Sequence, residues 1–491
     1  MSRLEEHIFA ICKKAGGEKA FWWRGAWWSR NVLYEMISKC RDTLKDAGFG
    51  EGQILAAIMP NCPLLLSLAV AVWSLRGTLL PLNLQAGRLN MAKNLKHAGV
   101  SLAIMPEGME SVAESLTEMG ILTVTAPLEG PLPSVKVKGV KSSDAEKAVL
   151  FYTSGTTGAP KAVPLTHRNL LDNVSKSIEH FMELQPEDRF LNVLPNFHAL
   201  GFTTSSLLPL LGEFSQVILP NFMPAENTLA AIREAEVTAV IAVPTMIALM
   251  LGAIARGADV PRSIRILVSG GDKFPPLLDQ RIQKVFGLGV LEGYGLTETS
   301  PVVSVSPGQK VRKLGTVGTI LKGYEVQIRD REGNIVKDPK EEGILWLKGP
   351  SVFQGYFKDP ERTAERIKDG WFNTGDIVKI DEDGYLSILD RESDIIIVGG
   401  FNVYPAEVEE VIRSIPGVLE SAVVGVPHPI SGEIVKAYVV KRPGAELQPR
   451  EIISYCKERL AHYKVPRVVE FIDELPRSSI GKVLRRELRN R

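Results

Sequence analysis

The feature that most constrains the fold is a series of short apolar runs, rich in β-branched residues, that end in loops of small residues or proline. They are AVLFYTSG ending at Gly155, VTAVIAVP ending at Pro244, IRILVSGG ending at Gly271 and GVLEGYG ending at Gly295. Such runs are typical of strands buried on both faces, and open α/β sheets bind ligands beyond the carboxyl ends of their strands. The sequence therefore predicts an α/β fold with a site among these loops.

Length, charge and cysteine content limit the class of protein. A chain of 491 residues exceeds the usual size of one compact core, so we expect at least two domains. Its 58 Lys and Arg residues against 57 Asp and Glu residues leave a net charge of +1, too little for a nucleic-acid-binding surface. The cysteines form no CxxC pair, so reduced, buried thiols are predicted rather than a zinc site or disulfides.

Neither the start of the chain nor its most apolar run predicts a membrane protein. The first residues, MSRLEEHIFAICKK, lack the order of a signal peptide, and we assign the cytoplasm. The apolar run at residues 64–75 is shorter than the roughly 20 residues that span a bilayer, which predicts a buried helix. The segment FWWRGAWWS is open to two interpretations, a membrane-interface element or a β-hairpin. Gly25 between two aromatic pairs favours the hairpin.

Turn signals divide the C-terminal part of the chain. Residues 315–390 alternate short strands with turns such as REGN and DEDG, which predicts a β-rich subdomain. After Arg391, strand and helix patterns alternate in a separate α+β unit. We therefore predict a large N-terminal α/β domain, residues 1–390, and a small mobile C-terminal domain, residues 391–491, with the active site in the cleft between them.

The segment YTSGTTGAPK, residues 152–161, follows an apolar strand and is built to bind phosphate. Its glycines let backbone N–H groups approach an anion, while hydroxyl groups and one lysine add donors and charge. It is not a Walker loop, because Ala162 follows Lys161 where that motif has Ser or Thr. The predicted phosphate-binding residues are Thr153, Ser154, Gly155, Thr156, Thr157, Gly158 and Lys161.

With this loop the chain resembles the adenylate-forming superfamily of acyl-CoA synthetases, luciferases and nonribosomal peptide adenylation domains. Further signatures follow in the order of the family: LPNFHALG, VSGGDKFP, GYGLTETSP, WFNTGDIV, LDRESDIIIVGGFNVYPAEVEE and PRSSIGKVLRREL. The resemblance covers nearly the whole chain. It implies that ATP activates a carboxylic acid as an acyl-adenylate and that a thiol then accepts the acyl group.

The resemblance also implies the roles of individual residues. Glu298, with Thr297 beside it, would bind Mg²⁺ on the phosphates, and Lys482 would bridge the attacking carboxylate and the α-phosphate. Asp376 and Arg391 would bind the ribose hydroxyl groups. The segments beside adenine are Ser269, Gly270, Gly271, Gly293, Tyr294 and Gly295. The arginines after Lys482, namely Arg485, Arg486 and Arg489, are expected to form a solvated basic face.

The residues at the acyl pocket favour an alkyl chain. The segments that line it in the family supply no carboxylate for an amino-acid ammonium, and Gly293 stands where diacid ligases carry an arginine. A narrow apolar channel suits a fatty acid. The predicted pocket residues are Phe197, His198, Ala199, Leu200, Gly201 and Val243, with Gly295 beside them. For His198 we favour a place in the pocket wall over a role as base, since a carboxylate needs no base to attack.

Two segments are predicted to serve the second half-reaction. Gly399 and Gly400 of GGFNVYP would give pantetheine room, and Ser393 stands at the pivot where the family normally has Asp or Lys. The thiol is that of coenzyme A or of an acyl carrier protein. An aryl-CoA ligase and a catalytically inactive, ligase-like binding module are also compatible with the motifs; the joint presence of Lys161, Glu298, Asp376, Arg391 and Lys482 argues against the inactive module. The length of the acid and the oligomeric state stay open.

Overall fold

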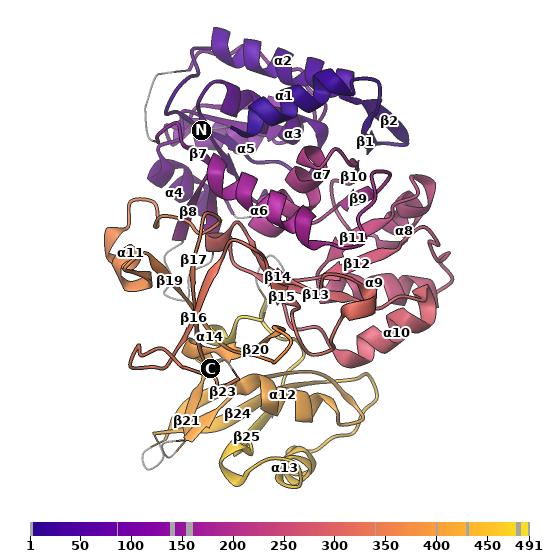
Figure 1. Ribbon diagram of the computed structural model, residues 1–491, viewed down its shortest axis with the longest axis vertical. Helices are drawn as coiled ribbons and strands as arrows, with labels where there is room; N and C mark the ends of the chain where they lie inside the picture. Colours follow the sequence, from indigo (N-terminus) through magenta and orange to yellow (C-terminus); the bar gives the residue numbers. More distant parts are fainter. Residues whose placement is uncertain are drawn as a thin grey trace. The chain divides into compact units, whose positions relative to one another are not determined.

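The computed structural model describes residues 3–85, 87–137, 143–153, 161–338, 340–398, 401–428, 432–477 and 483–489, and these form a mixed α/β protein (Figure 1). The chain divides into two compact units. The first contains Met1–Glu325 and Leu347–Phe372, and the second contains Val326–Trp346 and Asn373–Arg491. The predicted α/β class is therefore confirmed. The predicted boundary after Asp390 lies inside the second unit.

The first unit is built on two sheets whose central strands are parallel and buried. One runs β15-β14-β13-β12-β11-β9-β10-β1-β2. Its strands are β1 (Lys19–Trp23), β2 (Ala26–Ser29), β9 (Arg189–Asn192), β10 (Ser215–Ile218), β11 (Ala239–Ala242), β12 (Ile266–Ser269), β13 (Leu291–Gly295), β14 (Val302–Val305) and β15 (Thr319–Ile320). β13, β12, β11, β9 and β10 run parallel, so the loops that follow them lie at one edge.

The second sheet carries the strand that precedes the phosphate loop. Its order is β6-β5-β3-β4-β7-β8. The strands are β3 (Ile54–Ala57), β4 (Thr78–Pro81), β5 (Leu102–Pro106), β6 (Thr123–Ala126), β7 (Lys147–Thr153) and β8 (Lys161–Thr166). Every residue of β3 and β4 is buried, as expected for strands covered on both faces.

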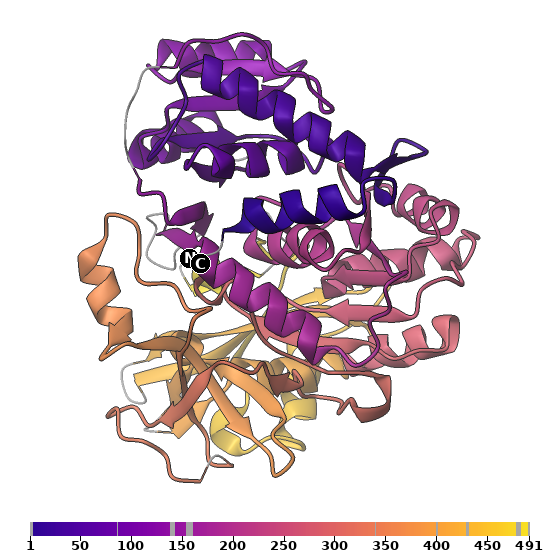
Figure 2. The ribbon, with the colours of Figure 1, turned by 45° about the horizontal axis from the view of Figure 1, so that its top comes forward.

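Helices cover these sheets (Figure 2), and one strongly apolar helix is almost entirely buried. α3 (Pro63–Ser74) begins with proline and has apolar residues on all sides, which suits a helix enclosed by protein. Trp73 Nε1 donates to the Ala148 carbonyl oxygen at 2.7 Å and so ties α3 to β7. The remaining helices of this unit are α1 (Leu4–Lys14), α2 (Arg30–Asp46), α4 (Arg88–Ala98), α5 (Glu110–Glu118), α6 (His167–His180), η1 (Gly201–Leu207), α7 (Leu208–Leu211), α8 (Ala225–Glu234), α9 (Pro244–Ala255), α10 (Pro276–Phe286), η2 (Thr297–Thr299), η3 (Gln309–Val311) and α11 (Pro360–Arg366).

A five-stranded sheet follows in the β-rich segment. Its order is β16-β17-β19-β18, with β20 beside β19. The strands are β16 (Glu325–Arg329), β17 (Gly343–Lys348), β18 (Ile367–Lys368), β19 (Trp371–Ile380) and β20 (Leu386–Arg391).

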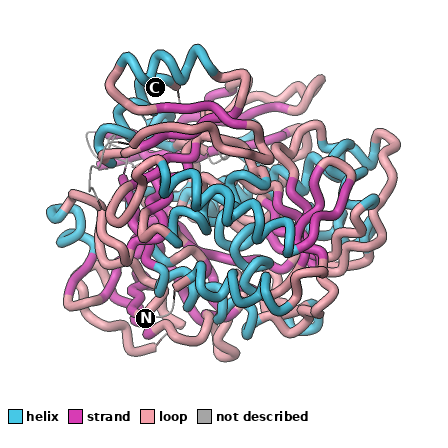
Figure 3. The backbone as a smooth tube through the Cα atoms, turned by 90° about the horizontal axis from the view of Figure 1, so that it is seen from above, coloured by secondary structure: helices cyan, strands magenta, loops and turns pink. Residues whose placement is uncertain are grey.

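The second unit has its own sheet and core. Figure 3 distinguishes the helices and strands of the chain by colour. The sheet runs β22-β21-β24-β23, with β25 beside β24. Its elements are η4 (Glu392–Asp394), β21 (Ile396–Val398), β22 (Phe401–Val403), α12 (Pro405–Arg413), β23 (Val418–His428), β24 (Gly432–Lys441), α13 (Pro449–Lys457), η5 (His462–Lys464), β25 (Val468–Phe471) and α14 (Arg485–Arg489). An antiparallel bridge joins Arg477 to Val483, just before α14.

The arginines of α14 correct one expectation. Arg485 makes a two-pronged ion pair with the buried Glu409, with Nη2 2.9 Å from both carboxylate oxygens. Arg489 donates to the Ser393 carbonyl oxygen at 3.0 Å and lies 3.3 Å from Asp394. The predicted solvated basic face is thus wrong for Arg485 and Arg489, because buried or neighbouring carboxylates hold them against this unit. Arg486 is exposed, as expected.

Two other expectations are confirmed. β1 and β2 form a hairpin that turns at Arg24 and Gly25, both at positive φ, and Trp22 stands opposite Trp27. The cysteines Cys12, Cys40, Cys62 and Cys456 are buried free thiols. Throughout the described ranges, every helix is too short or too polar to cross a bilayer.

Candidate active site

The two strands beside the phosphate loop place its ends next to each other. β7 and β8 are antiparallel, and Thr153 is paired in register with Lys161. The loop therefore leaves the sheet and returns to it at adjacent positions. Five of the predicted phosphate-binding residues, Ser154, Gly155, Thr156, Thr157 and Gly158, lie outside the described residues.

Lys161 and Glu298 meet at a residue that the sequence analysis missed. Tyr356 donates its hydroxyl hydrogen to Glu298 Oε1 at 2.9 Å. The ammonium nitrogen of Lys161 lies 5.5 Å from the centre of the same ring. Two residues predicted to bind the phosphates and Mg²⁺ are therefore brought together, although 137 positions separate them (298 − 161).

The turn that carries Glu298 is held by backbone contacts from several elements. The Leu296 N–H donates to the Pro301 carbonyl oxygen at 3.0 Å, which closes the turn. Tyr324 donates its hydroxyl to the Thr299 carbonyl oxygen at 2.8 Å. Thr297 is half-buried beside Glu298. Mg²⁺ is held by few protein carboxylates and completes its shell with phosphate and water oxygens, so the single carboxylate of Glu298 is chemically suited to the predicted Mg²⁺ site. Among the described residues, no group of three His, Cys, Asp or Glu could hold a metal ion.

The ends of β12 and β13 bring the predicted adenine and acyl residues together. Ser269 is paired in register with Glu292, directly before GYG. A Cβ added to Gly270 would lie 3.5 Å from the Gly293 carbonyl oxygen, and one added to Gly271 would lie 3.5 Å from Val243 and 3.8 Å from Leu200. These contacts place Leu200 and Val243 against the glycines. At Gly293 an added Cβ would meet Val305 at 3.3 Å.

The segment with the other predicted pocket residues joins β9 to the π-helix η1. Ala199 and Gly201 are buried, and the rings of Phe197 and His198 lie 4.6 Å apart. Gly201 is required, because a Cβ there would lie 2.5 Å from two backbone carbonyl oxygens. Asn61, also missed from sequence, secures the segment by donating to the Leu194 carbonyl oxygen at 2.8 Å.

A carboxyl group beside GYG has an unusual environment. Burial raises the pKa of Glu292 to about 7; Asp279 adds to the rise, while the Gly315 N–H, Lys273 and Arg312 oppose it. Asp279 is itself buried and paired with Arg312, with Nη1 and Oδ1 2.9 Å apart.

In the second unit the two predicted ribose-binding residues are cross-strand neighbours. Asp376 of β19 pairs in register with Arg391 of β20, and Arg391 Nε lies 3.0 Å from Asp376 Oδ1. Asp376 is 2% exposed, so its carboxylate is held in the protein. The side chain of Arg391 is partly exposed to solvent. The structure therefore brings together an acceptor and a donor suited to a pair of hydroxyl groups.

The predicted hinge and thiol residues also belong to the second unit. Ser393 lies in η4, between Arg391 and an Asp394 that faces the arginines of α14. Phe401, 57% exposed, stacks on Tyr463 with ring centres 4.7 Å apart. Gly399, Gly400 and Lys482 lie outside the described residues.

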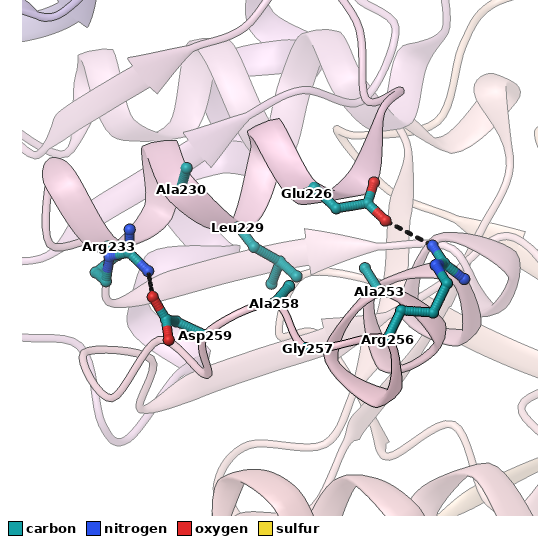
Figure 4. Close-up of a pocket in the computed structure, with 9 residues that line it drawn as sticks. All are labelled: Glu226, Leu229, Ala230, Arg233, Ala253, Arg256, Gly257, Ala258 and Asp259. Atoms are coloured by element: carbon teal, nitrogen blue, oxygen red, sulfur yellow. Dashed lines mark hydrogen bonds and ion pairs between the residues drawn. The ribbon is translucent and has the colours of Figure 1, made fainter.

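A separate hollow lies away from these residues. A pocket of about 350 Å³ lies between α8 and α9 and is crossed by the ion pairs Glu226–Arg256 and Arg233–Asp259 (Figure 4). It contains none of the predicted site residues.

The chain is similar to known proteins over most of its length. Residues 8–357 match the family model for AMP-binding enzymes, and residues 407–482 match that for the AMP-binding enzyme C-terminal domain. A long-chain-fatty-acid–CoA ligase of Yersinia pestis is 40% identical over 349 residues, which cover 71% of this chain but 62% of the ligase. A feruloyl-CoA synthase of Amycolatopsis sp is 37% identical over 467 residues, 94% of this chain and 93% of the synthase.

The fold has relatives among solved structures. The crystal structure of ATP-bound MatB from Rhodopseudomonas palustris superimposes with a TM-score of 0.89 at 29% identity and covers 99% of this chain and 98% of that one. The two family models cover most of the sequence, and the first alone covers more than half of it. The chain therefore belongs to the AMP-binding enzyme family.

Proposed function

We propose that this protein is an acid–thiol ligase that activates a fatty acid with ATP and then transfers the acyl group to coenzyme A. In the first step a carboxylate oxygen attacks the α-phosphorus and pyrophosphate leaves. In the second, the thiol sulfur attacks the acyl carbon and AMP leaves. The observation that carries the proposal is the convergence of Lys161 and Glu298 on Tyr356, beside the phosphate loop.

Each group has a physical task in the first step. Two unit negative charges about 4 Å apart repel by roughly 4 kcal/mol at an effective dielectric near 20, so the acid and ATP need cations between them. Lys161 supplies one positive charge. Glu298 is suited to hold Mg²⁺, which would add positive charge beside the phosphates. By resemblance to the family, Lys482 would contact the attacking carboxylate. Asp376 accepts hydrogen bonds from the ribose hydroxyls, with Arg391 fixing its orientation.

The small residues at the strand ends support an alkyl substrate. A Cβ added to Gly271 would lie 3.5 Å from Val243 and 3.8 Å from Leu200, so apolar side chains lie beside this glycine. The long-chain ligase of Yersinia pestis agrees with a fatty acid, but the match spans 62% of its length. An aromatic acid is the second candidate, because the feruloyl-CoA synthase aligns over 94% of this chain.

An ATP–pyrophosphate exchange screen tests the proposal. The purified chain is offered fatty acids of increasing length, ferulate, benzoate and amino acids, and the best acid is then tested with coenzyme A and with an acyl carrier protein. We expect exchange with fatty acids and thioester formation with coenzyme A. Exchange with ferulate alone would show that the protein is an aryl ligase. Transfer only to the carrier protein would show that the carrier protein, and not coenzyme A, is the thiol acceptor. No exchange with any acid would contradict adenylation.

A further inference from the structure

The segment at residues 353–358 connects two parts of the phosphate site that are far apart in sequence. At one end, the Phe353 N–H donates to the Glu298 carbonyl oxygen at 2.8 Å. At the other, the Phe357 N–H donates to the carbonyl oxygen of Ala162, the residue after Lys161, at 2.9 Å. These bonds fix the segment between η2 and β8, and Tyr356 lies in its middle.

A residue of α11 also holds Tyr356 in position. Its backbone N–H donates to Thr363 Oγ1 at 2.9 Å. Gly355, at φ +144°, lets the chain pass this threonine, since an added Cβ would lie 2.6 Å from Thr363 Cγ2. The Phe353 ring packs on Tyr356 with centres 4.8 Å apart. The tyrosine is therefore held by its backbone and its ring, independently of Glu298.

The hydroxyl of Tyr356 and the carboxylate of Glu298 have complementary hydrogen-bonding roles. A phenol has one hydrogen to donate, and an ionised carboxylate can only accept, so Tyr356 donates to Glu298 Oε1 at 2.9 Å. The second carboxylate oxygen, Oε2, is not engaged by this hydroxyl and is therefore the oxygen that can turn to a cation.

We propose that Tyr356 is a positioning residue that orients Glu298 for Mg²⁺ and offers its ring face to Lys161, joining both cations of the phosphate site in one unit. The hydroxyl engages Oε1, which leaves Oε2 as a single-oxygen ligand for the metal. The ring places the Lys161 ammonium within cation–π distance. The inference rests on the proposed use of ATP with Mg²⁺. It adds Tyr356 to the site as a residue that acts through Glu298 and Lys161.

Tyr356→Phe removes the hydroxyl and keeps the ring, and Tyr356→Leu removes both. The metal is titrated in two ways: Mg²⁺ in pyrophosphate exchange, and Mn²⁺ by electron paramagnetic resonance with a non-hydrolysable ATP analogue. Hydrogen-bonding partners of metal ligands contribute about 10-fold or more to metal affinity. We expect Tyr356→Phe to raise both half-saturating concentrations by about 10-fold, with the exchange rate near wild type at saturating Mg²⁺. Tyr356→Leu should also weaken binding of the analogue without metal.

Tyr438→Phe is the matched control. Tyr438 is buried in the second unit and donates its hydroxyl to the Leu488 carbonyl oxygen at 2.9 Å, so the control loses a buried hydrogen bond outside the site. It should leave the metal titration unchanged. If Tyr356→Phe behaves like wild type and this control in both titrations, the proposal is overturned. The Mn²⁺ measurement needs no acid, so a wrong acid would show as absent exchange with the metal effect intact.

Discussion

Gly295 has no room for a side chain. An added Cβ would lie 1.9 Å from the Pro301 carbonyl oxygen, which also accepts the Leu296 N–H at 3.0 Å. Both contacts are with backbone, so Gly295→Ala must shift the turn that carries Glu298. We expect a loss of about 1–3 kcal/mol in stability, from urea unfolding, and weaker binding of ATP with Mg²⁺, from calorimetry.

Gly293→Ala is the comparison for that variant. Its Cβ would lie 3.3 Å from Val305 Cγ2, where a side chain can yield by a few tenths of an ångström. It should therefore fold and bind ATP nearly as the unchanged chain does. Equal losses in the two variants would contradict the account of Gly295.

Glu292 predicts a pH dependence of stability. Burial raises its pKa to about 7, so the native state binds this proton more tightly than the unfolded chain does. The resulting stability is fully present below the ordinary glutamate pKa and is lost as the pH rises through about 7. Glu292→Gln, which cannot ionise, should remove about 1–3 kcal/mol of that fall in the free energy of unfolding. The measurement is urea unfolding of both proteins at acidic and alkaline pH; parallel curves would mean that Glu292 does not titrate in this range.

Among the elements, η4 is the one whose backbone is predicted to turn between half-reactions. Ser393 lies in this short helix, and Arg489 holds its carbonyl oxygen. Ser393→Pro would restrict φ to about −65° and delete an N–H donor, so we expect near-normal adenylation but strongly slowed transfer to coenzyme A. Ser393→Gly, which keeps the N–H and frees the backbone, should transfer normally. The two half-reactions are timed separately, and equal loss in both would place the pivot elsewhere.

The strand ends could be predicted from the sequence, whereas several residues that hold the site in place could not. Buried runs ending in glycine place Gly270, Gly271 and Val243 at one sheet edge, because parallel neighbours share the direction of their carboxyl ends. Tyr356 contacts Glu298 across 58 residues and Asn61 contacts Leu194 across 133 residues, and the periodicity of apolar residues carries no information at that range. Arg485 was misjudged for the same reason, since Glu409 lies 76 residues before it.

At the scale of the whole molecule, the predicted catalytic and ATP-binding residues are divided between two units. Glu298 and Lys161 belong to the first, whereas Asp376, Arg391 and Lys482 belong to the second. We predict that Lys482→Ala lowers adenylation by about 100-fold or more, the usual effect of removing one such electrostatic donor. Pyrophosphate exchange measures this step. Transfer from synthetic acyl-adenylate to coenzyme A should persist, and a mutant with normal exchange would show that Lys482 has another role.

An antiparallel bridge joins Arg477 to Val483, and Arg485 forms an ion pair with the buried Glu409 two residues further along the chain. The residues that follow Lys482 are therefore attached to the second unit at two points. We predict that glycines inserted between Lys482 and Val483 would lower adenylation, measured by pyrophosphate exchange, because they would separate the predicted catalytic lysine from this attachment.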